Sequence, residues 1–237
     1  MSVASSNRIG IIPARLHSTR FPKKILVDID GKPMVVRTAE QAIKAKSLDR
    51  VIIAIDDDET RQALRNFDCE IVMTSTRHNS GTDRIAEVVE NINDADVIVN
   101  IQADEPFINP KLIDKLVDTH SDLTIEMSTL VSTHLTPSDC ANESVVKAFI
   151  DENNFAVDFK RITPANHKNL GIYGFTRKTL LHFVSLKQTF NEKTRNLEQM
   201  RALDNGIKIK AVMTDEDSLS INTKDDLLHI YKNGGAL

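Results

Sequence analysis

The sequence contains few cysteines, and its first long loop contains no glycine. Only two of the 237 residues are cysteines, Cys69 and Cys140, and they match no metal-binding or redox spacing. So few thiols argue against a disulfide framework and favour a reducing compartment. The loop after the first apolar segment lacks the glycines of a Walker loop or a dinucleotide-binding fingerprint, so neither motif applies.

The sequence also lacks long hydrophobic segments and a large net charge. Its first residues, MSVASSNR, contain no signal-peptide core, and no apolar run approaches the roughly 20 residues of a membrane span. A net charge of −4 and a pI near 6.0 disfavour broad binding to nucleic acid or anionic membranes. We therefore expect a soluble, cytoplasmic protein with neither a nucleic-acid nor a membrane partner.

The first half of the chain alternates short apolar segments with amphipathic ones. Strands are predicted at 9–14, 51–56, 70–73 and 96–102, and helices at 33–46, 58–67 and 82–92. In the last helix, Ile85, Val88, Val89 and Ile92 share one face. Continuous apolar strands that alternate with helices indicate an α/β fold with a mostly parallel, doubly wound sheet. Ligands bind such sheets at the carboxyl ends of the strands, near the switch in strand order.

The second half has a different pattern, which predicts a small antiparallel part. Residues 144–161 predict a hairpin with its turn at DENN, and further strands are expected at 169–175 and 207–213. Helices are expected at 177–186, 194–205 and 222–232, with Gly206 as the C-cap of the second. We see no linker or repeat, so we predict a single domain over 1–237 with an antiparallel insertion at about 122–175.

Three polar segments lie where strands end. The segment RIGIIPARLHSTRFPKKIL (8–26) places Arg15, Arg20, Lys23 and Lys24 on the loop after a strand, where they form either an exposed basic surface or a phosphate site. HNSGTDR (78–84) precedes a helix, for which it supplies an N-cap at Ser80 or Thr82. NIQADEP (100–106) places acids directly after a buried strand, where a carboxylate suits Mg²⁺.

These segments together resemble the sugar cytidylyltransferases, most closely the CMP-Kdo synthetase (3-deoxy-manno-octulosonate cytidylyltransferase) family. The resemblance rests on IIPARLHSTRFPKKIL, IDGKPM, MTSTRHNSGTDRIAEVVE, VIVNIQADEPFI, VVKAFID, NLGIYGF and LEQMRAL, which occur in order along nearly the whole chain. It implies a Rossmann-like nucleotidyltransferase domain. It also implies transfer of CMP from CTP to the anomeric hydroxyl of an acidic keto-sugar, with release of pyrophosphate.

The resemblance also implies roles for individual residues. Catalytic roles fall on Arg15, Lys24 and Asp104, and nucleotide contacts on Ala14, Arg15, Lys24, Arg77, Ser80, Gly81, Thr82 and Gln102, with Arg84 as a further charged candidate. Sugar contacts fall on Gln102, Arg161, Asn169, Tyr173 and Glu198. Asp104 and Asn222 take the positions of the ligands to Mg²⁺, while Glu105 orders the loop. A homodimer formed through the hairpin is expected.

The chain departs from the family pattern mainly on the sugar and metal side. Lys23 and Ala103 replace glycines, Asn169 replaces a histidine, and DFKR (158–161) replaces YFSR. Asn222 replaces a metal-binding aspartate and removes one charge, although Asn222 also suits an N-cap with Asp225 at N3.

Three readings follow from this pattern of matches and departures. The first is CMP transfer to Kdo or a close relative. The second is CMP transfer to another acidic sugar, a modified octulosonate or a nonulosonate, since PKK at 22–24 resembles CMP-sialate synthetases. The third is a CTP-binding pseudoenzyme with a regulatory role. The retention of Arg15, Lys24, Gln102 and Asp104 favours the two enzyme readings.

Overall fold

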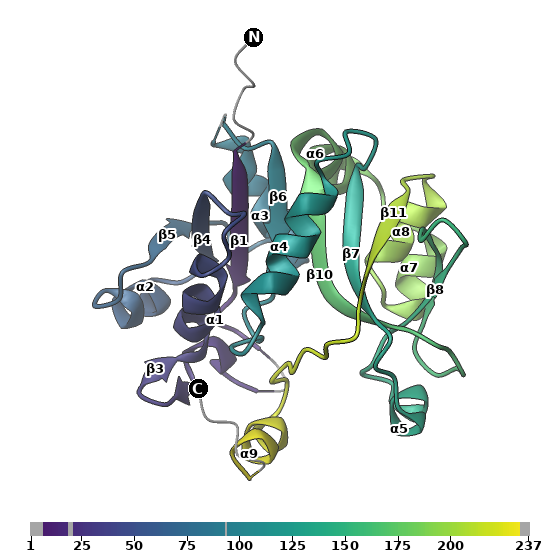
Figure 1. Cartoon of the computed structure of the whole chain (residues 1–237). Helices are drawn as coiled ribbons and strands as arrows, with labels where there is room; N and C mark the ends of the chain where they lie inside the picture. The colour runs from purple at the N-terminus through teal and green to yellow at the C-terminus, as the bar shows by residue number, and fades with distance from the viewer. Residues whose placement is uncertain (1–6, 19–20, 93, 233–237) are drawn as a thin grey trace.

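The apolar strands form one nine-stranded sheet in a computed structural model that describes residues 7–18, 21–92 and 94–232 (Figure 1). The order along the sheet is β11-β7-β10-β6-β1-β4-β5, and β8 and β9 join it through β10. These strands are β1 (Arg8–Ala14), β4 (Arg50–Ile55), β5 (Glu70–Met73), β6 (Val97–Asn100), β7 (Met127–Ser132), β8 (Lys147–Ile150), β9 (Ala156–Lys160), β10 (Lys168–Thr176) and β11 (Ile209–Thr214). A separate small ribbon pairs β2 (Asp28–Ile29) with β3 (Lys32–Pro33).

Helices cover both faces of the sheet, as the continuous apolar strands predict. Successive residues of β1 enter opposite cores, because strand side chains alternate between faces: Ile11 packs in one core and Ile12 in the other. One core contains residues of α1 (Met34–Ile43) and α4 (Pro110–Thr119). The other contains residues of α3 (Gly81–Glu90), α6 (Arg177–Ser185) and α8 (Gln199–Asp204). The doubly wound prediction is therefore confirmed.

The strand order reverses beside β1, and this reversal positions the site. The chain proceeds from β1 to β4 and, after α2 (Asp58–Leu64), to β5. It then returns through α3 to β6, on the other side of β1. All four strands are parallel, so the segments that follow β1 and β6 emerge together at one edge of the sheet. A cleft is expected at such a switch point.

The antiparallel part of the fold is built around β10. This strand pairs antiparallel with β6, β7 and β8, and β8 and β9 form the predicted hairpin. Asn154 in its turn has a φ of 58°, in the left-handed region that Asn tolerates better than most residues. Within the expected insertion at about 122–175, β7 and β10 lie in the central sheet, while β8 and β9 form its antiparallel extension.

The single helix expected at 194–205 is wrong. The structure has α7 (Phe190–Arg195) and then α8, separated by Asn196, whose φ of 52° ends α7. The turn at 196–198 directs Asn196, Leu197 and Glu198 into the wall of a cleft. The predicted stop at Gly206 is confirmed: its φ is 76°, and the amide of Ile207 donates to Ala202 O at 2.9 Å in a Schellman arrangement.

The chain after β11 forms a strap, residues 215–223, that crosses below the sheet to α9 (Lys224–Lys232), as Figure 1 shows in yellow. The expected N-cap at Asn222 with Asp225 is wrong. Thr223 accepts from the amide of Asp226, whose carboxylate accepts from the amides of Asn222 and Thr223. The cap lies one residue later, which leaves the Asn222 side chain directed toward the cleft.

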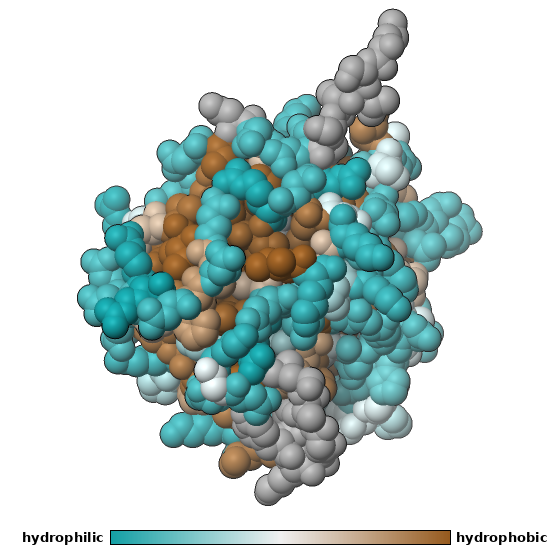
Figure 2. Space-filling model, turned by 60° about the vertical axis from the view of Figure 1, so that its left-hand side comes forward, coloured by the Kyte–Doolittle hydropathy of each residue, from teal (hydrophilic) through white to brown (hydrophobic). Residues whose placement is uncertain are grey.

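Two short helices, η1 (Lys24–Leu26) and α5 (Pro137–Ala141), complete the elements of the described residues. Within those residues no helix combines the length and the apolar character that crossing a bilayer requires. Figure 2 shows one face of the molecule, on which apolar side chains are surrounded by polar ones.

Candidate active site

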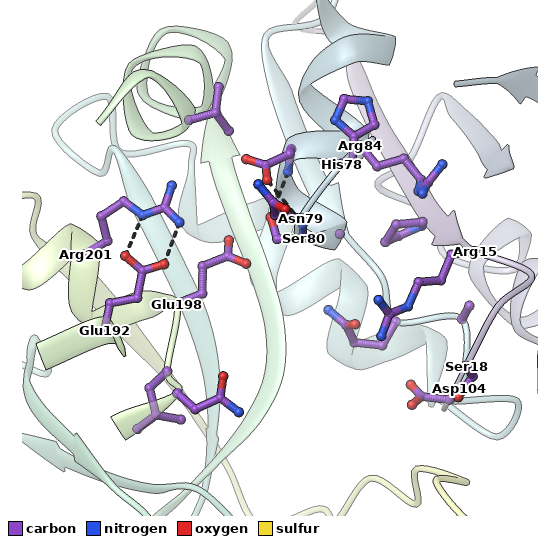
Figure 3. Close-up of a pocket in the computed structure, with 18 of the residues that line it drawn as sticks. Arg15, Ser18, His78, Asn79, Ser80, Arg84, Asp104, Glu192, Glu198 and Arg201 are labelled. Atoms are coloured by element: carbon purple, nitrogen blue, oxygen red, sulfur yellow. Dashed lines mark hydrogen bonds and ion pairs between the residues drawn. The ribbon is translucent and has the colours of Figure 1, made fainter. Parts of the chain in front are cut away.

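A cleft of about 680 Å³ opens where β1 and β6 end. Figure 3 shows its two walls: Arg15, Ser18 and Asp104 on one side, and Glu192, Glu198 and Arg201 on the other. The cleft therefore lies at the switch point of the sheet and is closed from the far side by α7, α8 and the turn between them. Predicted residues that line it are Arg15, Lys24, Ser80, Gly81, Arg84, Gln102, Asp104, Glu198 and Asn222.

Lys24, Asp104 and Asn222 meet in this cleft although they lie far apart in the sequence. Lys24 Nζ is 2.6 Å from Asp104 Oδ2 and donates to Asn222 Oδ1 at 3.2 Å. The strap is anchored beside them, because the amide of Ile221 donates to Asp104 O at 2.9 Å. Two of the three predicted catalytic residues, Lys24 and Asp104, thus form one cluster with the predicted metal ligand Asn222.

The donor set of this cluster fits Mg²⁺. Asp104 Oδ2 and Asn222 Oδ1 converge on a single cation, the Lys24 ammonium, so two oxygens of suitable chemistry already face one positive charge. Mg²⁺ commonly takes one or two protein oxygens and completes its shell with phosphates and water. The described residues contain no group of three or more His, Cys, Asp or Glu side chains that could hold a metal.

Glu105, next to Asp104, supports the loop. Its carboxyl is buried and accepts a hydrogen bond from Ser218 Oγ at 2.7 Å. Burial raises the pKa of Glu105 to about 8, and this bond opposes the rise only in part. Because Ser218 belongs to the strap, Glu105 ties the strap to the loop that carries Asp104.

The start of α3 forms a second wall of the cleft. Ser80 is the N-cap, in a capping box with Asp83, so one of the two predicted caps is confirmed. A Cβ on Gly81 would lie 3.1 Å from Pro13 Cγ, so the loop packs closely against the end of β1. Thr82 is buried behind it and accepts from Asn100 Nδ2.

Two arginines near α3, Arg84 and Arg77, do not extend freely into the cleft as an arginine that binds phosphate would. Arg84 is buried, and its guanidinium is 2.9 Å from Asp56 Oδ2, so it braces the loop even though it lines the cleft. Arg77 is exposed and is not among the residues that line the cleft, which His78 and Asn79 do line. Ala14 is buried at the end of β1, and Arg20 lies outside the described residues.

The predicted sugar residues gather in an adjoining pocket of about 360 Å³. It is lined by Gln102, Arg161, Asn169, Tyr173 and Glu198, and it also reaches Asp104 and Asn222. Asn169 accepts from Thr129 Oγ1 and donates to the Tyr173 hydroxyl, both at 2.7 Å. Gln102 Nε2 donates to Gly171 O at 3.1 Å. Neutral hydrogen-bonding groups on β10 therefore form much of this pocket.

Burial changes the ionisation of two groups in this pocket. It raises the pKa of the Glu198 carboxyl, against the effect of hydrogen bonds from Thr82 and Ser80. It also raises the pKa of Tyr173, so this hydroxyl remains a neutral donor. The Glu198 carboxyl and the Tyr173 hydroxyl are therefore both hydrogen-bonding groups that lie inside a desolvated pocket.

The cations of the sugar pocket already have protein partners. Arg161 donates to three backbone carbonyls, those of Glu143, Arg195 and Asn196. Lys168 is buried and pairs with Asp217 of the strap at 2.7 Å. Arg161, predicted as a sugar ligand, therefore also holds the 196–198 turn in place.

Lys23 lies on the same loop as Arg15 and Lys24 but does not line the cleft. Its φ of 53° is left-handed, which explains why glycine suits this position. Its ammonium is 2.6 Å from Glu59 on α2, and both side chains are about half exposed. Lys23 is absent from the residues that line the cleft, so its charge neutralises Glu59.

Apart from Glu198, the wall formed by α7 and α8 was not predicted from the sequence. Glu192 and Arg201 form a buried, two-pronged ion pair there, and Lys193 and Asn196 also line the cleft. A signal was present: Thr189 and Glu192 have the T-x-x-E spacing of a capping box, which the structure contains. That spacing marks a helix start at 190 and so a shorter helix than the one expected.

Comparison with known proteins places these features in a family. A cytidylyltransferase family model matches residues 9–209. The 3-deoxy-manno-octulosonate cytidylyltransferase of Chloroherpeton thalassium is 40% identical, with 93% of this chain and 94% of that protein covered. The protein of the same name from Trichlorobacter lovleyi is 39% identical, with coverages of 92% and 95%.

Solved structures agree with this result. The structure of a CMP:2-keto-3-deoxy-manno-octonic acid synthetase complexed with CTP has a TM-score of 0.90 and 31% identity, and it covers 97% of this chain and 99% of its own. A 4-diphosphocytidyl-2C-methyl-D-erythritol synthase from Anaerococcus prevotii, with a TM-score of 0.66 and 13% identity, shares the fold. The chain therefore belongs to the cytidylyltransferase family of nucleotidyltransferases, together with the 3-deoxy-manno-octulosonate cytidylyltransferases that it matches over nearly its whole length.

Proposed function

We propose that this protein transfers CMP from CTP to the anomeric hydroxyl of 3-deoxy-manno-octulosonate (Kdo) and releases pyrophosphate. The observation that carries the proposal is the Lys24, Asp104 and Asn222 cluster at the junction of two pockets. Asp104 and Asn222 line both pockets, so the cluster lies where a nucleotide in one could meet a sugar in the other. The family and the names of the relatives support the choice of substrates.

The reaction requires little covalent participation by the protein. The anomeric oxygen attacks the α-phosphorus, the bond to the oxygen bridging the α- and β-phosphates breaks, pyrophosphate leaves, and the hydroxyl proton is released. Charge grows on the phosphate oxygens, so positioned cations supply most of the stabilisation. We assign Arg15 and Lys24 to the triphosphate, with Ser80, Gly81 and Gln102, which also line the cleft, as further nucleotide contacts.

The metal site belongs to the same proposal. Asp104 and Asn222 would hold Mg²⁺, which when bound supplies positive charge to the phosphates. Lys24 would then exchange its contact with Asp104 for one with the triphosphate. The amide at Asn222 contributes an oxygen without charge, so we expect weaker Mg²⁺ binding than a carboxylate would give. Asn222→Asp should lower the Mg²⁺ concentration needed for half-maximal activity.

The direct test is pyrophosphate release from CTP and Mg²⁺ with a panel of acidic keto-sugars. We expect turnover with Kdo, at least tenfold greater in kcat/KM than with a nonulosonate. CTP binding without turnover on any sugar would contradict the proposal and favour the pseudoenzyme. Turnover on a modified octulosonate or a nonulosonate in preference to Kdo would support the second candidate, for which PKK at 22–24, Asn169 and the DFKR segment are the motivating departures.

Quaternary structure and location are part of this proposal. Val157 on β9 and Ile162 just after it are exposed apolar side chains on the hairpin, which suit a homodimer through this region. Both cysteines are free, as is usual in the reducing cytoplasm, where we expect the protein to act. Light scattering of the wild type and of Val157→Lys tests the interface: a dimer that becomes monomeric supports it, and an unchanged mass contradicts it.

A further inference from the structure

A niche of about 100 Å³ adjoins the cleft and the sugar pocket, and the mechanism above gives no role to Asn100, which lines it. It shares Gln102 with both larger pockets and Tyr173 with the sugar pocket, and its deeper wall is apolar, formed by Met127, Phe175 and Phe183. A water molecule occupies about 30 Å³ in the liquid. The niche is therefore large enough for a small polar arm of a ligand.

Asn100, at the end of β6, supplies an unsatisfied acceptor to this niche. Its side chain is 2% exposed and lines the niche, and its Nδ2 donates to Thr82 Oγ1 at 3.3 Å. Its Oδ1 is buried and accepts no hydrogen bond from the residues that the structure describes. Because Nδ2 is directed at Thr82, Oδ1 faces away from it. A buried acceptor of this kind is costly unless a donor reaches it.

The strand register places this acceptor beside the sugar pocket. Asn100 on β6 is directly paired with Tyr173 on β10, and Tyr173 is paired in turn with Thr129 on β7. Tyr173 lines both the niche and the sugar pocket. A ligand group that passes Tyr173 from the sugar pocket therefore enters the niche at Asn100.

We propose that this niche is a subsite for a hydroxyl-bearing arm of the acceptor, and that Asn100 Oδ1 accepts a hydrogen bond from one of its hydroxyls. The inference deepens the proposed function and rests on it. A polyhydroxylated sugar carries the donors that the acceptor needs, and a carbon of the arm suits the apolar wall. Asn100 thus becomes a specificity-determining residue, because a site built to bond a hydroxyl rejects an analogue that lacks it.

The test is a cycle of enzyme and substrate changes with CTP and Mg²⁺. Wild type and Asn100→Leu, which is similar in size, are assayed with the acceptor sugar and with its monodeoxy analogues. We expect Asn100→Leu to lower kcat/KM for the parent sugar about tenfold and to change the KM for CTP by less than twofold. One deoxy analogue should be about tenfold poorer for the wild type and less than twofold poorer for the variant.

Two controls keep the result interpretable. Asn100→Ala places less demand on packing and should show the same coupling, so a poorly folded leucine variant does not decide the outcome. Asn91→Ala, which removes an exposed amide at the end of α3, should leave all parameters unchanged.

Four outcomes would overturn the inference. Equal losses on every analogue would indicate that Asn100 only maintains structure, and a raised KM for CTP alone would assign the niche to the nucleotide. If the wild type turns over the acceptor sugar, but the effect of the Asn100 substitution is the same whichever hydroxyl is removed, the subsite is refuted and the proposed function stands. A wild type that turns over no keto-sugar would refute both.

Discussion

The two halves of the molecule use their cations differently. In the nucleotide half, residues 7–119, Arg15 is exposed in the cleft and Lys24 faces Asp104 where substrate would bind. In the acceptor half, residues 120–232, cations hold protein to protein: Arg161 binds carbonyls, Arg195 pairs with Asp158, and Arg201 pairs with Glu192. The acceptor half thus uses these cations to assemble its wall, whereas the nucleotide half uses Arg84 in that way and leaves Arg15 and Lys24 lining the cleft.

This difference follows from how each wall is built. The nucleotide wall consists of segments that leave parallel strands at one edge, so the sheet itself positions them. The acceptor wall consists of short helices and turns with little regular backbone pairing, so side-chain ion pairs must position it. Changes in the two halves should therefore have different consequences for stability and activity.

The largest expected effect is on the stability of the acceptor wall. Arg201→Met should lower the free energy of unfolding by about 3 to 5 kcal/mol, because it leaves the Glu192 carboxylate buried without its partner. Arg61→Met is the exposed control: Arg61 pairs with Asp58 on the surface of α2, and the change should cost less than about 1 kcal/mol. Urea denaturation measures both, and equal effects would contradict a stabilising role for the buried Arg201–Glu192 pair.

The second effect is on activity in the nucleotide half. Asp104→Asn should reduce pyrophosphate release by about 10² to 10³-fold, because it removes the single charge among the proposed metal ligands. Unfolding should change little, since Asp104 is partly exposed. Asp225→Asn, on the exposed first turn of α9, is the control and should retain wild-type rates. Intact turnover in Asp104→Asn would refute the metal assignment.

The third effect concerns the junction of the halves, where His120 at the end of α4 contacts Ser128 of β7 at 2.8 Å. Burial lowers the pKa of His120 to about 4. Between about pH 6.5 and 4 the unfolded chain binds a proton that the folded chain does not, so stability falls as pH falls, by up to about 3 kcal/mol. Denaturation of wild type and His120→Gln at several pH values checks this, and identical slopes would contradict it.

The smallest expected effect is on stability and concerns the backbone conformation of Lys23. Lys23→Gly and Lys23→Ala both remove the contact with Glu59, but only glycine accepts a φ of 53° without strain. The glycine variant should therefore be more stable than the alanine variant by about 1 kcal/mol in thermal denaturation. Both should keep the KM for CTP within twofold, because Lys23 is outside the cleft lining. A large rise in the KM for CTP would indicate instead that Lys23 contacts the nucleotide.

The parallel strands β1, β4, β5 and β6 were predictable because each is a nearly continuous apolar run, but β7 was not. Its sequence, MSTLVS, contains Ser128, Thr129 and Ser132, all of them fully buried. Their hydroxyls bond groups outside the strand: the His120 ring, Ile172 O and Glu216 O. A pattern of hydrophobicity cannot reveal polar residues whose burial depends on partners supplied by other strands.

The parallel core and the positions of Arg15, Lys24, Ser80 and Asp104 follow from local sequence, because these residues directly follow strands or begin a helix. Which charges remain available in the cleft depends instead on how the folded chain brings its segments together. Lys24 and Asn222 meet across 198 residues of sequence, and Arg161 is engaged by carbonyls of other segments. Such contacts depend on where separate segments meet in space, and local propensity carries no information about that.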